Sequence, residues 1–231
     1  MALTSRLLYQ ATRFVVSIYF RFYHRAEVSG RENIPRDRAV IVACNHASYL
    51  DPPLAGYAFY PGVLRFIAWD HLFRNPLFGL YLRTVGAIPV SRDSASSSAA
   101  LVRLAIGLIK EGKNMFICPE GHRTETGKLE PLEGGVSILA LKTGAPVIPT
   151  WVGGTFRAMS PSMAFPRPKK LYIVFGKPIY MEKLPAELDE RGKRKYILDR
   201  IDEFYVRMEE EDKKKYGGNQ LPEKFSQNGQ D

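Results

Sequence analysis

A histidine and an aspartate five residues apart form the most informative pair in the sequence. They lie in segment 45–51, NHASYLD, which follows an apolar run and precedes Pro52 and Pro53. On a continuous helix, side chains five apart point ~140° away from each other. The prolines exclude a helix upstream and favour its first turn downstream. We therefore expect His46 on a loop and Asp51 as a helix N-cap, close enough to pair.

Such a pair has a defined chemistry. A carboxylate held against one imidazole nitrogen fixes the tautomer and stabilises the imidazolium, so the other nitrogen can act as a general base near neutral pH. Asn45 and Ser48 would support the same loop. The alternative is purely structural, with Asp51 capping the helix and His46 an ordinary hydrogen-bonded loop histidine.

Two arginines follow other strand-like runs. Arg123 comes after the run 116–118 and the turn residue Gly121, which tolerates a positive φ, and Arg92 comes after the run 87–90. A guanidinium offers a planar fork that suits phosphate. A single arginine is more often a solvated surface charge. Ligands of open α/β sheets, however, collect beyond the carboxyl ends of strands, and the coincidence with His46 predicts one anion-binding cleft there.

The elements that must position these loops alternate along the chain. Apolar, β-branched runs predict strands at 39–44, 64–69, 87–90, 115–118, 147–152 and 171–175. Helical patterns lie at 52–60, 76–83, 94–111 and 133–143, and a charged helix with an apolar stripe extends from beyond Pro185 to about Lys215. This alternation predicts an α/β fold with a mixed, largely parallel central sheet flanked by helices.

Length and composition favour one globular domain. The chain has 231 residues, of which 45% are hydrophobic and 25% charged, so neither a disordered chain nor a polytopic membrane protein is expected. Two cysteines, Cys44 and Cys118, do not form a disulfide framework. No run approaches the ~18 to 20 uncharged apolar residues of a membrane-spanning helix. We expect an N-terminal segment 1–25, a main domain 26–216 and a disordered tail 217–231.

Charge and amphipathicity point to a membrane surface. Residues 1–181 hold 22 Lys and Arg against 11 Asp and Glu, within an overall charge of +9. Nucleic-acid motifs are absent from the sequence, so anionic lipid is favoured. The first 25 residues carry an apolar stripe (Leu7, Ala11, Phe14, Ile18, Phe22) opposite a polar one (Arg6, Gln10, Arg13, Ser17, Arg21, His24). This pattern is typical of an interfacial helix, although a helix packed on the core has the same periodicity.

The motifs together resemble the glycerolipid acyltransferase family, which contains lysophosphatidic acid acyltransferase. NHASYLD resembles the family's N-H-x4-D block and CPEGHRT (118–124) its F-P-E-G-T-R-S block. GAIPVSR (86–92) and VIPT (147–150) resemble two further blocks, and all four occur in the family's order. The CPEGHRT block departs from the family pattern at Cys118 and His122.

The resemblance implies roles for these residues. His46 would deprotonate an acceptor hydroxyl for attack on an acyl thioester, and Asp51 would orient it. Arg92 and Arg123 would hold the acceptor phosphate, and Glu120 and Gly121 would contribute to the same substrate-binding loop. The expected reaction is transfer of a fatty acyl group from acyl-CoA or acyl carrier protein to the sn-2 hydroxyl of 1-acyl-glycerol-3-phosphate, giving phosphatidic acid.

Other functions remain open at the level of sequence. The departures of the CPEGHRT block from the family pattern allow another acceptor, such as a lysophospholipid or a lyso-ornithine lipid. An acyl-enzyme hydrolase is a more distant alternative, because the segment 135–139 lacks the closing glycine of a G-x-S-x-G elbow. A membrane adaptor without activity is the third. We expect no metal and no cofactor, and a peripheral or monotopic location on the cytoplasmic face of a membrane.

Overall fold

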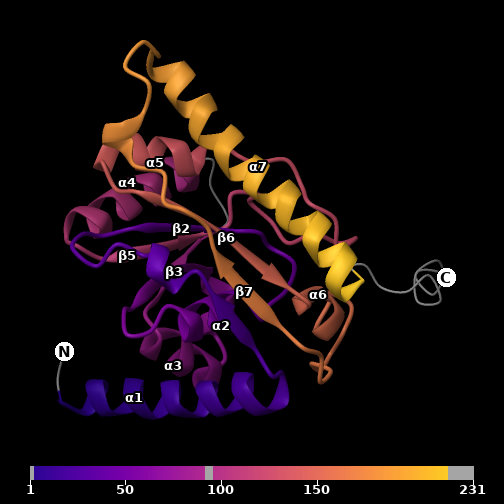
Figure 1. Cartoon of the computed structure of the whole chain (residues 1–231). Coiled ribbons are helices and arrows are strands. Elements are labelled where there is room, and N and C mark those ends of the chain that lie inside the picture. The colour runs from indigo at the N-terminus through magenta and orange to yellow at the C-terminus, as the bar shows by residue number, and fades with distance from the viewer. Residues whose placement is uncertain (1–2, 92–95, 218–231) are drawn as a thin grey trace.

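The structure is a computed structural model that describes residues 3–91 and 96–217. Its centre is a seven-stranded sheet in the order β1-β7-β6-β2-β5-β3-β4 (Figure 1). The strands are β1 (Glu27–Ser29), β2 (Ile41–Cys44), β3 (Leu64–Trp69), β4 (Ala87–Val90), β5 (Asn114–Ile117), β6 (Val147–Gly153) and β7 (Tyr172–Phe175). Every neighbouring pair is parallel except β6 and β7, which are antiparallel. The predicted mixed, largely parallel α/β sheet is confirmed.

Helices cover both faces of this sheet. They are α1 (Leu3–Ile18), α2 (Asp51–Ala58), α3 (Pro76–Thr84), α4 (Ser96–Lys110), α5 (Gly135–Thr143), α6 (Thr155–Ala158) and α7 (Glu190–Tyr216). In Figure 1, α1, α2 and α3 lie on one side of the sheet, whereas α4, α5 and α7 lie on the other. The result is a three-layer arrangement.

Strand β2 shows why the sheet is apolar on both faces. Its residues are all buried, and alternate side chains point to opposite faces. Ile41 and Ala43 pack into the core under α4, α5 and α7, whereas Val42 and Cys44 pack into the core on the α2 side. A central parallel strand buried twice reads as a continuous apolar run, which is how the sequence predicted it.

Two elements differ from the sequence expectation. Strand β1 was not predicted, because three residues with a single apolar side chain, Val28, carry no alternation to detect. Helix α6 was also missed, since a four-residue helix is shorter than any window that reveals a 3.6-residue period. The other helices and strands begin and end within a few residues of their predicted bounds.

Helix α1 packs on the body through one face only. Phe20, in the π-helical turn Tyr19–Tyr23 that follows α1, is 1% exposed and lies 5.7 Å from the ring of Tyr57 in α2. The guanidinium of Arg13 lies 4.2 Å from the centre of the Tyr60 ring. By contrast, the predicted apolar stripe points outward, with Phe14 67% and Phe22 70% exposed. The described residues Phe14, Ile18 and Phe22 of the stripe therefore face outward, whereas Val16 and Tyr19 pack against the core.

The C-terminal helix α7 docks on the sheet as expected, since Ile197, Ile201 and Phe204 are buried against the core. A buried network also holds it. The hydroxyl of Tyr172 in β7 donates to the carboxylate of Asp212 in α7 and accepts from the indole N–H of Trp151. Of the predicted tail 217–231, residues 218–231 lie outside the described part of the chain.

Candidate active site

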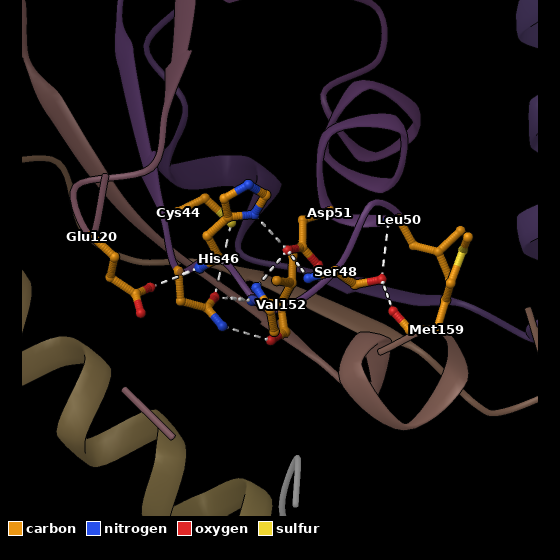
Figure 2. A network of polar contacts seen from close by, with 10 residues as sticks. Cys44, His46, Ser48, Leu50, Asp51, Glu120, Val152 and Met159 are labelled. Atoms are coloured by element: carbon orange, nitrogen blue, oxygen red, sulfur yellow. Dashed lines mark hydrogen bonds and ion pairs between the residues drawn. The ribbon is translucent and has the colours of Figure 1, made fainter. Parts of the chain in front are cut away.

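The loop that follows β2 is tied to the sheet by Asn45. Its side-chain amide donates to the carbonyl of Val152 at 3.1 Å, and its side-chain oxygen accepts from the N–H of Val152 at 2.7 Å (Figure 2). These two bonds continue the pairing between β2 and β6 beyond the last ladder residue. The loop thus leaves the sheet edge in a fixed direction, with His46 as its next residue.

Asp51 then folds the loop back on itself. Its Oδ2 accepts three hydrogen bonds, from His46 Nδ1 at 2.9 Å and from the backbone N–H groups of Ala47 and Ser48, each at 2.7 Å (Figure 2). The carboxylate is fully buried and belongs to the first turn of α2, where the helix dipole favours a negative charge. The predicted contact between His46 and Asp51 is present.

Asp51 is not the helix N-cap that the sequence predicted. Residue Leu50 occupies the cap position and no side chain caps the helix. A capping side chain bonds an N–H two or three residues ahead. Pro53, two residues ahead, carries no N–H, and the N–H of Leu54, three ahead, donates to the carbonyl of Leu50, so the carboxylate bonds upstream donors instead.

The imidazole of His46 consequently presents its other nitrogen to an open space. Nδ1 is held by Asp51, and Nε2 carries no hydrogen bond to any residue the structure describes. The side chain is 19% exposed and lines a cavity of about 810 Å³. Neutral imidazole with Nδ1–H bonded to a carboxylate leaves the Nε2 lone pair free to accept a proton. This geometry suits a general base.

Ser48 and Thr124 complete the support of the loop. The hydroxyl of Ser48 donates to the carbonyl of Met159 at 2.7 Å and accepts from the N–H of Leu50 at 3.1 Å (Figure 2). The buried Thr124 donates its N–H to the carbonyl of His46 at 3.0 Å. His46 is therefore flanked by fixed backbone on both sides.

Glu120 takes a different position from the substrate contact that the resemblance implied. It is 2% exposed, and its carboxylate accepts from the N–H of His46 at 2.7 Å and from the N–H of Glu130 at 3.0 Å. Burial, together with the charges of Asp51 and Glu130, raises the pKa of Glu120 to about 7. The two hydrogen bonds lower the pKa but do not outweigh the burial. The side chain points into the protein because both of its oxygens are used by backbone donors. Glu120 thus positions His46.

Gly121 makes the turn that leads from Glu120 to the cavity. Its φ is +74°, and a Cβ there would meet the carboxylate of Glu133 at 2.3 Å. The backbone conformation therefore favours glycine, whereas the exposed Glu133 side chain can move aside for a Cβ. Gly121, His122 and Arg123 all line the cavity.

Arg123 is held by an aromatic ring that the sequence did not point to. Its guanidinium lies 3.5 Å from the centre of the Tyr49 ring, and Nη2 donates to the Tyr49 hydroxyl at 2.9 Å. Nη1 is buried and has no hydrogen-bond partner among the described residues. A buried guanidinium N–H without a partner is a natural donor for an anionic ligand. Arg92, the other predicted anion-binding residue, lies outside the described residues.

The rest of the cavity is mostly apolar and is lined by residues of helices α1, α2 and α3 and strand β3. Its deeper walls come from side chains such as Leu64, Phe66 and Leu82, and one side is formed by α1 residues including Thr12 and Arg13. No Asp or Glu is among the lining residues that the structure describes. The cavity therefore combines the polar side chains of His46 and Arg123 with a mainly apolar lining, in which Arg13 is a further cation.

The two cysteines are poor candidates for a covalent nucleophile. Burial raises the pKa of the Cys44 and Cys118 thiols well above the usual value. The thiolate is the reactive form of cysteine, so both side chains stay unreactive near neutral pH. The described part of the chain holds no cluster of three or more His, Cys, Asp or Glu side chains that could bind a metal ion. It also holds no helix of the length and apolarity that crossing a bilayer demands.

Comparisons with known proteins place this site in a family. The family model described as Acyltransferase matches residues 25–153. A 1-acyl-sn-glycerol-3-phosphate acyltransferase of Borreliella burgdorferi is 33% identical over 75% of this chain and 69% of its own length. The Bacillus subtilis enzyme of the same name is 28% identical over 67% of this chain and 73% of its own. This chain covers 50% of a chloroplastic relative from Brassica napus, at 29% identity.

A solved structure shares the fold as well. The crystal structure of the 1-acyl-sn-glycerophosphate acyltransferase PlsC from Thermotoga maritima superposes with a TM-score of 0.66 at 28% identity, covering 87% of this chain and 82% of that one. The matched family region contains His46, Asp51, Glu120 and Arg123. On this evidence, the chain belongs to the acyltransferase family.

Proposed function

We propose that this protein transfers a fatty acyl group from acyl-CoA or acyl carrier protein to the sn-2 hydroxyl of 1-acyl-glycerol-3-phosphate, forming phosphatidic acid. The observation that carries this proposal is the imidazole of His46, fixed by Asp51 at 2.9 Å and facing a cavity that is cationic at one end and apolar at the other. The names of the relatives that match this chain support the same acceptor.

In the proposed reaction, His46 first accepts a proton and later gives it up. Nε2 of His46 takes the proton of the acceptor hydroxyl while the oxygen attacks the thioester carbonyl. The tetrahedral intermediate collapses with loss of the thiolate, which then takes the proton from the imidazolium. Asp51 stabilises that imidazolium, and a positioned base contributes typically ~10²- to 10⁴-fold. In this proposal no metal and no cofactor takes part.

The two ends of the cavity suit the two parts of the acceptor and donor. Nη1 of Arg123, which has no hydrogen-bond partner among the described residues, would bond the acceptor phosphate, and the described part of the lining holds no carboxylate to repel it. The apolar part between α2, α3 and β3 would hold an acyl chain. A volume of about 810 Å³ is within the range of sites that enclose a small molecule.

One observation keeps a second acceptor class in view. His122 occupies the exposed position beside Arg123 in the cavity lining, so an additional ring lies where the acceptor head group would bind. Another lysolipid, such as a lysophospholipid or a lyso-ornithine lipid, would meet that ring differently from a bare phosphate monoester.

We also propose that the protein acts at the cytoplasmic face of a membrane as a peripheral or monotopic protein. Helix α1 supports this, because its outward side carries Phe14, Val15 and Ile18, while its inward side lines the cavity. A lysolipid leaving the bilayer would then pass along α1 to reach His46.

A donor-by-acceptor panel tests the proposed function. Purified protein is supplied with acyl-CoA or acyl carrier protein and with 1-acyl-glycerol-3-phosphate, a lysophospholipid with a larger head group, or a lyso-ornithine lipid, and the products are measured by mass spectrometry. We expect phosphatidic acid as the main product. Preferred turnover of an acceptor without phosphate would contradict the role given to Arg123.

A further inference from the structure

A basic and aromatic loop lies beside the C-terminal end of α1. Residues 160–170 connect α6 to β7 and carry Phe165, which is 81% exposed. In Figure 1 this connection runs along the same edge of the molecule as the end of α1. Phe165 belongs to no helix or strand and is not among the residues that line the cavity. A single exposed phenylalanine is ordinary on a protein surface, so Phe165 is informative only together with the residues around it.

Specific hydrogen bonds hold the loop against the π-helical turn Tyr19–Tyr23 and His24, which follow α1. The hydroxyl of Tyr23 donates to the carbonyl of Pro166 at 2.8 Å. Nδ1 of the buried His24 lies 2.9 Å from the carbonyl of Lys169, and the N–H of Leu171 donates to the carbonyl of His24 at 3.2 Å. The loop and the end of α1 therefore keep a fixed arrangement relative to each other.

The charges on these two segments are almost all positive. Residues 19–27 and 160–170 together contain five cations, all exposed, which are Arg21, Arg25, Arg167, Lys169 and Lys170. The single acid among them, Glu27, is paired with Lys170 at 2.6 Å. Exposed apolar side chains belong to the same area, since Phe22 is 70% and Tyr23 40% exposed. Aromatics flanked by cations are the composition of surfaces that bind anionic bilayers.

We propose that the loop 160–170 is a second membrane-binding element, in which Phe165 inserts below the head groups of an anionic bilayer while the surrounding cations contact lipid phosphates. The inference rests on the proposed function, in which the acceptor is a membrane lipid. Contact at the loop as well as along α1 fixes the orientation of the helix on the bilayer. The side of α1 that lines the cavity is then held facing His46.

Vesicle binding of two variants tests the proposal. Phe165→Ser should weaken partitioning about tenfold on all vesicles, because an interfacial aromatic contributes apolar burial. The double variant R167E/K169E should weaken it ~25-fold or more on phosphatidylglycerol vesicles and little on phosphatidylcholine, since each cation near an anionic surface is worth roughly fivefold. The matched controls are V206S and K110E, exposed residues on α7 and α4 that cover the other face of the sheet.

The binding measurement uses no substrate, so it tests the surface independently of the acceptor. Both variants should keep the wild-type turnover in neutral detergent micelles. Wild-type partitioning of both would overturn the proposal. Unchanged partitioning combined with lost turnover in micelles by R167E/K169E would also overturn it, and would indicate an acidic protein partner instead.

A reporter variant gives a second reading that does not depend on affinity. In Phe165→Trp, emission above the background of the two native tryptophans should shift to the blue when anionic vesicles are added, and brominated lipid should quench it. Emission that stays at its value in water, with the protein bound, would place the loop outside the bilayer and contradict the proposal.

Discussion

At the scale of single residues, the site depends on how Asp51 uses one oxygen. Three donors converge on Oδ2, so the carboxylate organises the loop 46–48 and the imidazole at once. Two prolines follow Asp51, so Pro53 offers no N–H to an N-cap, and the N–H of Leu54 donates to the carbonyl of Leu50. The presence of these prolines in the sequence made the contact with His46 predictable, although its exact form as a backward-facing carboxylate was not.

Replacing Asp51 by Asn should separate geometry from charge. The amide oxygen still accepts hydrogen bonds, but the imidazolium loses its counter-charge, so we expect kcat to fall ~10²-fold or more. The KM for the acceptor should change little, because Asp51 is not part of the cavity lining. Steady-state kinetics in detergent measures both. The control is D202N on the exposed side of α7, and a wild-type kcat in D51N would contradict the role.

Glu120 should give the protein a stability that depends on pH. Its pKa is about 7 in the fold against a usual 4.5, so the folded state binds the proton more tightly than the unfolded state. This contribution to the free energy of unfolding is about 3 kcal/mol in total. It is fully present below about pH 4.5 and is lost as the pH rises through about 7.

The variant E120Q removes that titration. Urea unfolding between about pH 4.5 and 7 should show a flatter dependence for E120Q than for the wild type, whereas E125Q, an exposed change in the same loop, should follow the wild type. E120Q should also lose activity, because its NH₂ group faces one of the two backbone N–H donors and cannot accept a hydrogen bond from it. Leaving that buried N–H without a partner costs about 1–3 kcal/mol of folding free energy. Parallel pH slopes for E120Q and the wild type would refute the assignment.

The pairing of Tyr49 with Arg123 shows what the sequence could not reveal at this scale. The two residues are 74 positions apart and belong to different loops. A tyrosine within a loop carries no periodicity and no charge, so nothing in its spacing indicates a partner. Only the packing of neighbouring strands β2 and β5 brings the loops together.

At the scale of elements, parallel strands gather the loops that carry chemistry. The carboxyl ends of β2 and β5 are adjacent, and the loops that follow them bring His46 and Glu120 to one edge of the sheet. Alternating strand and helix patterns predicted this because parallel strands share a direction. The pattern of α1 predicted its two stripes equally well. Which stripe would face the body was not predictable, because amphipathic periodicity is the same for a core and for a lipid surface.

Helix α2 should determine the length of acyl chain that the cavity accepts. Gly56 lines the cavity, and a Cβ built there would lie 3.4 Å from the ring of Phe66, so a larger side chain would fill the apolar part. We expect G56L to lower kcat/KM for long-chain donors about tenfold or more while short-chain donors are retained. Donor competition assays measure the ratio. The control is G107L on α4, where nothing lies within 4 Å, and an unchanged ratio in G56L would contradict the chain-binding role.

At the scale of the whole molecule, helix α1 would link the proposed membrane surface to the catalytic site. The inward side of α1 lines the cavity, and its outward side exposes Phe14, Val15 and Ile18. Charge agrees with this arrangement, since residues 1–181 are basic and the cavity lining holds no carboxylate among the residues the structure describes. These features support the proposal that the protein approaches an anionic surface with its cavity alongside.

Removing the outward aromatics of α1 should uncouple binding from catalysis. We expect F14S/F22S to bind anionic vesicles about tenfold or more weakly, because both side chains are exposed and contribute only at the bilayer. Activity on acceptor in detergent micelles should remain near that of the wild type. Sedimentation with vesicles and a micellar assay measure the two properties, with L104S on α4 as control. Equal loss of vesicle binding and of activity in micelles would show that these residues support the fold instead.

The most direct test of the account is the rate of phosphatidic acid formation by His46→Ala. The variant keeps the backbone N–H that bonds Glu120, so the loop stays in place, and its melting temperature should match the wild type. With acyl donor and 1-acyl-glycerol-3-phosphate both saturating, the rate should fall ~10²- to 10⁴-fold. A folded variant that forms phosphatidic acid within a few-fold of the wild-type rate would show that His46 is not the base.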